Sequence, residues 1–191
     1  RQTYDYSDLG CTHHCYGDVA MMRLIPNMQV FEPSTPQEFR TLFEKTWGNG
    51  LPKYFRLSKE QHSLDFNVEP EVMKIIRKSE DNRWVFVSGH VLDDVLESPK
   101  IGIIYVPTLS SVTKESYLEV SKVIEKAKKI YSVENHFTIG GLGDFISETF
   151  NVAVQRIGLE RKFLTNYGNF SNLRKDARMD RQSIIRKLSW I

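Results

Sequence analysis

The sequence predicts an α/β protein made of two successive α/β units, and three observations favour this fold class. Short apolar runs of strand length alternate with amphipathic segments of helix length along most of the chain. Residues 28–57 have the order strand, helix, strand, which is that of a βαβ unit and predicts parallel pairing. A charged stretch of weak periodicity at 59–83 then separates this unit from a second series of strands and helices.

The first unit begins with a polar turn that leads into a predicted helix from Asp18 to Ile25. The carboxylate of Asp18 suits a helix N-cap, and Pro26 ends the helix because it has no backbone N–H to donate. Residues 28–31 alternate between faces and predict a short strand.

A second predicted helix begins at Thr35. Thr35 suits the N-cap, Pro36 fits the first helical position, and Glu38 completes a capping box. Apolar residues at helical spacing predict a face in the core: Phe39, Leu42, Phe43 and Trp47. Residues 53–57 predict the second strand. The polar turn and Arg56 are expected at the edge where strands end and ligands bind.

The second unit is predicted from four apolar runs and the segments between them. The runs predict strands at 84–88, 101–106, 130–133 and 154–157. The predicted helices are a short one at 91–96, one with the apolar face Tyr117, Val120, Ile124 and Ala127, one after a loop that starts at Gly140, and a C-terminal one with the stripe Ile184, Ile185 and Leu188. Asp180 is expected to cap this last helix.

Length and composition exclude several classes of protein. At 191 residues the chain forms one large or two small domains, and its net charge of +2 implies no bulk attraction to nucleic acid or membrane. No apolar run is long enough to span a bilayer, and the first residues lack the apolar core of a signal peptide. The two cysteines stand in one turn, so no disulfide framework is predicted and a cytoplasmic location is expected. The chain lacks an initiator Met, as a fragment or a processed chain would.

The polar turn holds two thiols and two imidazoles between glycines, in the order Gly10-Cys11-Thr12-His13-His14-Cys15-Tyr16-Gly17. All four side chains are zinc ligands in other proteins. Adjacent histidines in a tight turn rarely reach one tetrahedral ion, however, and His62, His90 and His136 stand far away in the sequence. We therefore predict no metal site. From these residues alone, a plain surface turn and a loop that meets a cofactor or substrate both remain open.

The C-terminal stretch is rich in cations: Arg174, Lys175, Arg178, Arg181, Arg186 and Lys187. A nucleic-acid surface and an ordinary solvated helix face both fit this pattern. We favour the solvated face, because Asp176 and Asp180 stand among the cations and no recognisable binding module accompanies them. No nucleic-acid partner is therefore predicted.

Three motifs match a known family in the right order. Residues 10–14 followed by 18–28 resemble the Gly-Pro-Thr-His-His … Asp-Ile-Ala … Arg-Ile-Pro-Asn-Met segment of the transketolase family, which lies in the pyrimidine-binding domain of these thiamine-diphosphate enzymes. Residues 52–57 resemble the family's Pro-Val-Tyr-Ile-Arg-Leu strand, and 132–143 its Val-Glu-Glu-His … Gly-Gly-Leu-Gly signature. The resemblance spans nearly the whole chain and is greatest to split transketolases, in which this half is a separate subunit.

The resemblance implies a domain organisation and a reaction. Residues 1–66 are expected to form the second half of a pyrimidine-binding domain with a partial parallel sheet, 67–82 a linker, and 83–191 a transketolase C-terminal-type domain. The implied enzyme of carbohydrate metabolism transfers a two-carbon ketol unit between sugar phosphates with thiamine diphosphate and Mg2+. Two alternatives remain open: a 2-oxo-acid dehydrogenase beta-type subunit, suggested by residues 33–36, and a catalytically inactive domain for assembly or regulation.

The resemblance also implies roles for residues of this chain. His13 aligns with the catalytic histidine that faces the reacting carbons, and imidazole suits proton transfer near neutral pH. His14 and Arg56 are implied to bind the substrate, and the planar fork of Arg56 matches two oxygens of its phosphate. Glu134 and His136 are expected to be structural.

The same resemblance places the cofactor-binding residues outside this chain. The family's glutamate that activates the aminopyrimidine ring belongs before Arg1, and the Gly-Asp-Gly … Asn-Asn motif for diphosphate and magnesium is absent. Leu9 and Cys11 also replace an aspartate and a proline found in relatives. We therefore expect a chain that is inactive alone and works as a homodimer or as a heteromer with a diphosphate-binding subunit.

Overall fold

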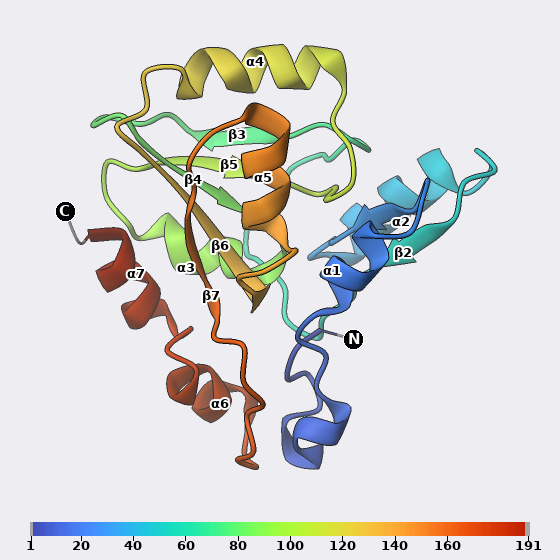
Figure 1. Cartoon of the computed structure of the whole chain (residues 1–191), viewed down its shortest axis with the longest axis vertical. Helices are drawn as coiled ribbons and strands as arrows, with labels where there is room; N and C mark the ends of the chain where they lie inside the picture. The colour runs from blue at the N-terminus through green and yellow to red at the C-terminus, as the bar shows by residue number, and fades with distance from the viewer. Residues whose placement is uncertain (1, 190–191) are drawn as a thin grey trace.

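The computed structural model describes residues 2–189, in which two α/β units lie side by side (Figure 1). The elements of the first unit are the 3-10 turns Ser7–Leu9 and Cys11–His13, helices α1 (Asp18–Arg23) and α2 (Pro36–Thr46), and strands β1 (Gln29–Phe31) and β2 (Lys53–Phe55). The two strands pair in parallel, with Val30 opposite Tyr54, so the predicted βαβ unit is confirmed. Thr35 caps α2 as predicted, because its Oγ1 accepts the Glu38 N–H at 3.1 Å.

The second unit is built on a sheet with the strand order β3-β5-β4-β6-β7. Its strands are β3 (Lys74–Arg77), β4 (Arg83–Val87), β5 (Gly102–Tyr105), β6 (Lys129–Phe137) and β7 (Gln155–Leu159). Its helices are the 3-10 turn Gly89–Val91 with α3 (Leu92–Leu96), then α4 (Lys114–Ile124), α5 (Leu142–Phe150), α6 (Phe170–Asp176) and α7 (Arg181–Ser189). Strands β5, β4, β6 and β7 run parallel, and β3 is an antiparallel edge strand. The predicted α/β class is confirmed.

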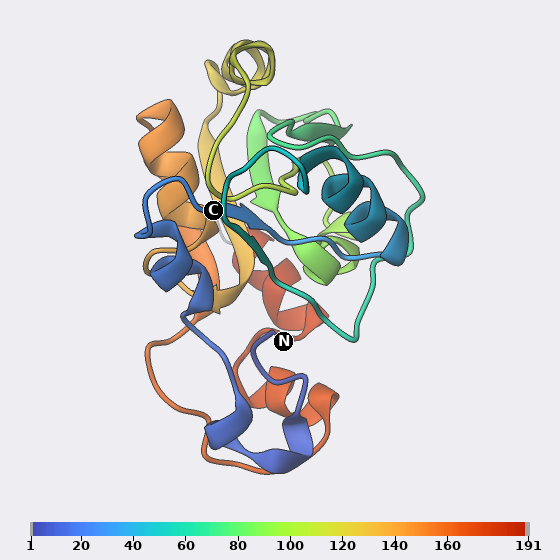
Figure 2. The same cartoon turned by 90° about the vertical axis from the view of Figure 1, so that its right-hand side faces the viewer.

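Helices cover both faces of this second sheet (Figure 1 and Figure 2). Successive side chains of β4 point to opposite faces and join separate apolar cores. Trp84 and Phe86 pack in the core that α4 and α5 cover, whereas Val85 and Val87 pack in the core that α3, α6 and α7 cover. Strands buried on both faces have continuous apolar runs, which is why the sequence marks β4 and β5 clearly.

The stretch expected to be a linker, 67–82, adds a strand to the second sheet. Ile75 of β3 lies opposite Ile104 of β5. Two isoleucines among charged residues are too few to predict a strand, and only the neighbouring β5 makes this segment extended. Helix α6 is a second element that the periodicity does not predict. The domain boundaries at 66 and 83 stay predictions.

The apolar face of α2 is less buried than its spacing predicts. Leu42 is fully buried, but Phe43 is 45% exposed and Trp47 is 69% exposed. Phe43 stacks on Phe39 and lies against Phe55 of β2. A sheet of two short strands covers only part of the helix face, so the expectation of a core position is wrong for Trp47.

Backbone hydrogen bonds join the two units on both sides of the segment 10–18. On one side the Leu109 N–H donates to the Val30 carbonyl at 2.8 Å. On the other side the Phe137 N–H, at the end of β6, donates to the Tyr16 carbonyl at 2.9 Å. The polar turn singled out in the sequence therefore lies where the units meet.

Candidate functional site

The polar turn is held by backbone hydrogen bonds at Cys15 and is covered by an aromatic ring at Gly10. Thr3 and Cys15 exchange N–H···O bonds of 3.0 and 2.9 Å, which ties the N-terminal segment to the end of the turn. Gly10 has φ +74°, and a Cβ there would lie 2.7 Å from the ring of Tyr167. Only glycine fits this position, because the backbone is left-handed and an aromatic ring covers it.

The two histidines of the turn differ in exposure. His13 is exposed, with Nδ1 3.0 Å from the hydroxyl of Thr12 and its ring 6.3 Å from that of Tyr6. His14 faces inward, with Nδ1 2.6 Å from the Tyr16 hydroxyl and Nε2 buried. Burial is the main cause that lowers the pKa of His14. His13 is therefore the solvent-exposed imidazole of this pair, and His14 helps to hold the turn.

Arg56 lies directly beneath the turn and is completely buried. Its Nε donates to Asp18 Oδ2 at 2.8 Å, and its Nη1 donates to Glu32 Oε1 at 2.8 Å. Its Nη2 donates to the backbone carbonyl of Asn135 at 3.0 Å and contacts that of Cys15 at 3.4 Å. One guanidinium thus joins the turn, β1 and β6, which belong to both units.

The carboxylates around Arg56 are themselves held in place. Asp18 Oδ2 also accepts the Tyr54 hydroxyl at 2.7 Å, and Glu32 Oε2 accepts the Ser88 hydroxyl at 2.7 Å. Burial opposes ionisation of Asp18, but the charge and hydrogen bonds of Arg56 outweigh it and lower the pKa of Asp18. The network is a buried ion-pair cluster in which Asp18 and Glu32 supply the counter-charges of Arg56.

This arrangement corrects two expectations. Arg56 has no exposed surface and two carboxylates as partners, so the part of the chain that the structure describes leaves no place for a substrate phosphate on it. Asp18 is the first residue of α1 and makes no capping bond, because its carboxylate is bound to Arg56. Sequence reasoning missed Asp18 and Glu32 as partners of Arg56. The signal available in the sequence was that Asp18 and Glu32 flank the mostly apolar residues 19–31.

Glu134 and His136 form the wall of this cluster on β6. The oxygens of Glu134 accept the N–H groups of Leu142 at 2.7 Å and Gly143 at 3.1 Å, where α5 begins. Burial raises the pKa of Glu134 to about 7 despite these bonds. Burial, followed by the charge of Arg56, lowers the pKa of His136 to about 4. A Cβ at Gly141 would lie 2.0 Å from Glu134 Oε2, so this glycine leaves room for the cap.

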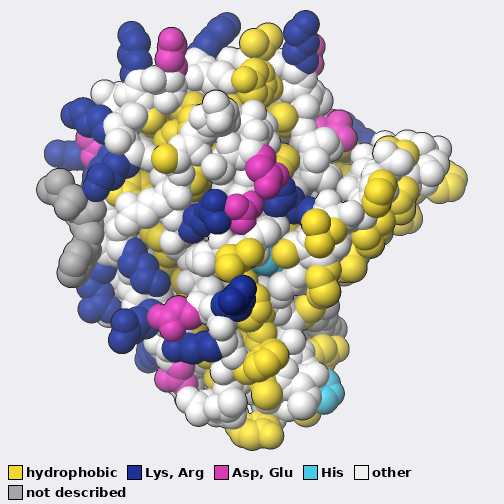
Figure 3. All heavy atoms as spheres, viewed as in Figure 1, with side chains coloured by type: hydrophobic (Ala, Val, Ile, Leu, Met, Phe, Trp, Pro, Cys, Tyr) yellow, Lys and Arg dark blue, Asp and Glu magenta, His cyan; other side chains and the backbone are white. Residues whose placement is uncertain are grey.

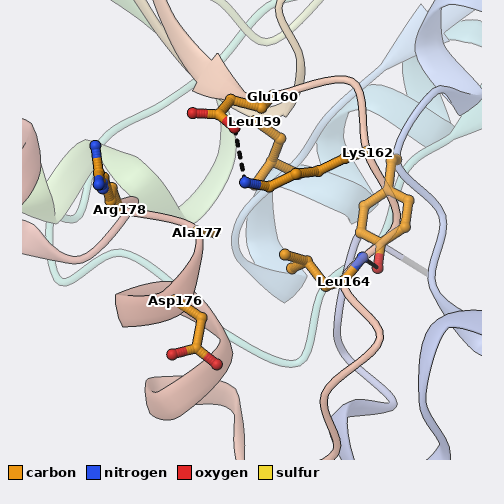
Figure 4. A pocket seen from close by; sticks show the side chains of 8 residues that line it. Leu159, Glu160, Lys162, Leu164, Asp176, Ala177 and Arg178 are labelled. Atoms are coloured by element: carbon orange, nitrogen blue, oxygen red, sulfur yellow. Dashed lines mark hydrogen bonds and ion pairs between the residues drawn. The ribbon is translucent and has the colours of Figure 1, made fainter.

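A cavity of about 290 Å³ lies next to Tyr16, between the segment that follows β7 and the end of α6 (Figure 4). Glu160 and Lys162 form an ion pair of 2.7 Å on its wall, and the Leu164 N–H donates to the Tyr16 hydroxyl at 3.3 Å. Asp176 and Arg178 lie across from them in Figure 4. His13, His14 and Arg56 do not line this cavity.

Residues 2–189 offer neither a metal centre nor a membrane span. No three His, Cys, Asp or Glu side chains in this range are grouped to hold a metal ion. No helix in the same range is long and apolar enough to cross a membrane.

Comparison with known proteins finds similarity to one family. Residues 1–63 match the model of the transketolase, pyrimidine binding domain. Over 94% of its length the chain is 26% identical to a subunit of the apulose-4-phosphate transketolase of Actinobacillus succinogenes, and it covers 62% of that subunit. The chain is related to the transketolase family. The resemblance predicted from the sequence motifs is thereby confirmed.

Two further proteins match nearly the whole chain. A 1-deoxy-D-xylulose-5-phosphate synthase of Thermus thermophilus is 26% identical over 94% of this chain, which covers 30% of that protein. A solved structure described as a split gene transketolase, inactive beta4 tetramer, has the same fold with a TM-score of 0.76 at 21% identity, over 93% of this chain and 61% of that one. The chain thus spans between 30% and 62% of the length of these proteins.

The transketolase family implies dependence on thiamine diphosphate, which this chain's own residues would have to fit. The described residues lack a cluster of metal ligands for a diphosphate-bound cation, and the buried carboxylates of Asp18 and Glu32 are bound to Arg56. These residues do not fit the diphosphate end of the cofactor. No chemical step through the cofactor is therefore assigned to them.

Proposed function

We propose that this chain is the C-terminal part of a transketolase-like enzyme that transfers a two-carbon ketol unit between sugar phosphates. The observation that carries the proposal is the similarity over 94% of the chain to a protein named as a transketolase subunit. The exposed His13 on a rigid turn is in agreement with it. The location we propose is the cytoplasm, and the pathway is one of carbohydrate metabolism.

The proposed active site is completed by another polypeptide or by another segment of the same protein. Thiamine diphosphate and Mg2+ would be held there, since the described residues do not fit the diphosphate. One relative is named as a single subunit of its transketolase, and another is a split-gene tetramer described as inactive. Both support a heteromer with a diphosphate-binding subunit, with a homodimer as the other arrangement. His13 would then act on a carbonyl or hydroxyl of the substrate, and the chain alone would be inactive.

We further propose Lys59 as the cation for the substrate phosphate, because Arg56 is neutralised. Lys59 is exposed, and its Nζ lies 5.1 Å from the ring centroid of Tyr6. Another neighbour of that ring is His13, at 6.3 Å between ring centroids. A flexible ammonium at this position supplies a point charge for a phosphate, without the two-pronged geometry of arginine.

The test is an assay of the protein combined with its diphosphate-binding partner. We expect ketol transfer from a ketose phosphate in the presence of thiamine diphosphate and Mg2+. Decarboxylation of 2-oxo acids in place of ketol transfer would indicate the beta-type dehydrogenase subunit, and no turnover with either substrate would indicate an inactive domain.

Lys59→Gln tests the cation separately. We expect KM for the phosphorylated ketose to rise by about ten-fold, with a small change in kcat, because one charge-assisted contact is lost. Lys53→Gln is the matched control, since its Nζ is bonded to Asn49 and the Leu51 carbonyl instead. An equal effect of both substitutions would refute the assignment of Lys59 and leave the ketol-transfer proposal standing.

A further inference from the structure

The cations of α6 and α7 fall into two classes with different surroundings. Arg174 pairs with Asp94 at 2.5 Å, and Arg181 pairs with Glu97 at 2.5 Å. The remaining four line one groove: Lys175, Arg178, Arg186 and Lys187. Within residues 2–189 these four form no ion pair. Arg174 and Arg181 are thus neutralised by carboxylates on or next to α3, whereas the other four cations line the groove without an ion pair.

The groove has the size of a small-molecule site. Its volume is about 730 Å³, and Gln155 of β7 and the last two helices line it. Its one carboxylate, Asp180, is engaged at the start of α7, where its oxygens accept the N–H and the hydroxyl of Ser183 at 3.2 and 2.6 Å. Figure 3 shows basic side chains gathered over this part of the molecule, toward the left of the view.

Lys187 and Arg178 are held in conformations that are unfavourable in free energy. The Nζ of Lys187 donates to the backbone carbonyl of Arg178 at 2.8 Å. Partial burial, followed by the nearby charge of Arg178, lowers the pKa of Lys187. Arg178 has φ +52° at the position after the end of α6, where glycine is the favoured residue. An anion in the groove would offset the repulsion between the charges of Arg178 and Lys187 and stabilise the charged form of Lys187.

We propose that this groove binds a small organic anion with two or more phosphate charges. Arginine and lysine together match phosphate oxygens, and the groove volume falls in the usual range for small ligands. The lining contains no aromatic side chain on which bases of a single strand would stack, which favours a small anion over nucleic acid. The groove lining contains neither His13 nor Lys59, the residues assigned above to ketol transfer.

The test is calorimetric titration of the protein with inorganic pyrophosphate at about 0.15 M salt. We expect saturable one-to-one binding that weakens by about ten-fold in Arg186→Gln and in Arg178→Gly. Lys122→Gln, an exposed lysine of α4, is the matched control and should bind like the unmodified protein.

Arg178→Gly keeps the experiment decisive, because glycine suits the left-handed backbone. We expect its urea midpoint to rise while pyrophosphate binding weakens, so lost binding cannot result from misfolding. Absence of binding to the unmodified protein, or equal loss in Lys122→Gln, would overturn the proposal. Tight binding of a single-stranded oligonucleotide through the same residues, without binding of pyrophosphate, would also overturn it in favour of a nucleic-acid surface.

Discussion

The cluster around Arg56 and the groove at α6 and α7 handle positive charge in opposite ways. Arg56 is completely buried and has a carboxylate on each of two nitrogens. The four cations of the groove are at least partly exposed and form no ion pair with a carboxylate in the described residues, although Asp180 and Glu160 lie near them. Comparison of the two shows that an arginine in a family motif is not by itself a ligand-binding residue. The location of its counter-charges decides whether it holds the fold or meets a ligand.

Removal of Arg56 should have the largest effect on stability. Arg56→Leu leaves Asp18 and Glu32 buried without their partner, so we expect the free energy of unfolding to fall by about 3–5 kcal/mol. Urea unfolding measures this change, with Arg186→Gln as the control that should stay within about 0.5 kcal/mol. Unchanged stability with a raised KM for a phosphorylated substrate would return Arg56 to the phosphate-binding role.

The second-largest expected effect is a loss of folding free energy on acidification, caused by buried titratable side chains. Burial lowers the pKa of His90 to about 3 and that of His136 to about 4, so the unfolded chain binds more protons below pH 6.5. The raised pKa of Glu134, about 7, acts in the opposite direction, because the folded state then keeps a proton between pH 4.5 and 7. Two histidines against one glutamate leave a net loss of about 1–2 kcal/mol from pH 7 to pH 5.

Two variants sharpen that titration. His90→Leu removes one of the two histidines whose protonation favours the unfolded state. The remaining histidine and Glu134 then nearly cancel, so the urea midpoint should change little between pH 7 and pH 5. Glu134→Gln removes the offset and should make the loss at pH 5 larger than in the unmodified protein. An identical pH profile for all three proteins would contradict the assignment of the titrating groups.

Loss of the capping hydrogen bond of α2 should reduce stability by a smaller amount, because this bond is local and involves no buried charge. In Thr35→Ala the Glu38 N–H at the start of α2 loses its acceptor. We expect a loss of about 1 kcal/mol, measured by thermal unfolding. Thr35→Ser is the conservative control and should retain nearly all of the stability.

The smallest expected change in stability has the opposite sign and lies in the groove. Arg178→Gly relieves a left-handed backbone and should raise the free energy of unfolding by about 0.5–1 kcal/mol. Denaturation in urea measures the gain. A loss of stability would mean that the Arg178 side chain stabilises the fold, in contrast to the unpartnered role assigned to it here.

Local patterns in the sequence determined most of the helices and strands. Apolar runs predict β4, β5 and the start of β6, and the caps at Thr35 and Asp180 are where the residue types put them. These features depend on neighbours a few residues apart, which a sequence displays directly. The turn that the motif singles out exposes His13, whose role in catalysis stays a prediction.

Only the tertiary structure decided which charges are satisfied. Asp18, Glu32 and Arg56 meet across 24 to 38 residues of chain, so no local pattern pairs them. The same is true of β3, which is a strand because β5 lies beside it. It is also true of the groove cations, which, unlike Arg174, form no ion pair with α3. Burial and pairing are properties of the packed chain, and they separate a structural arginine from a binding one.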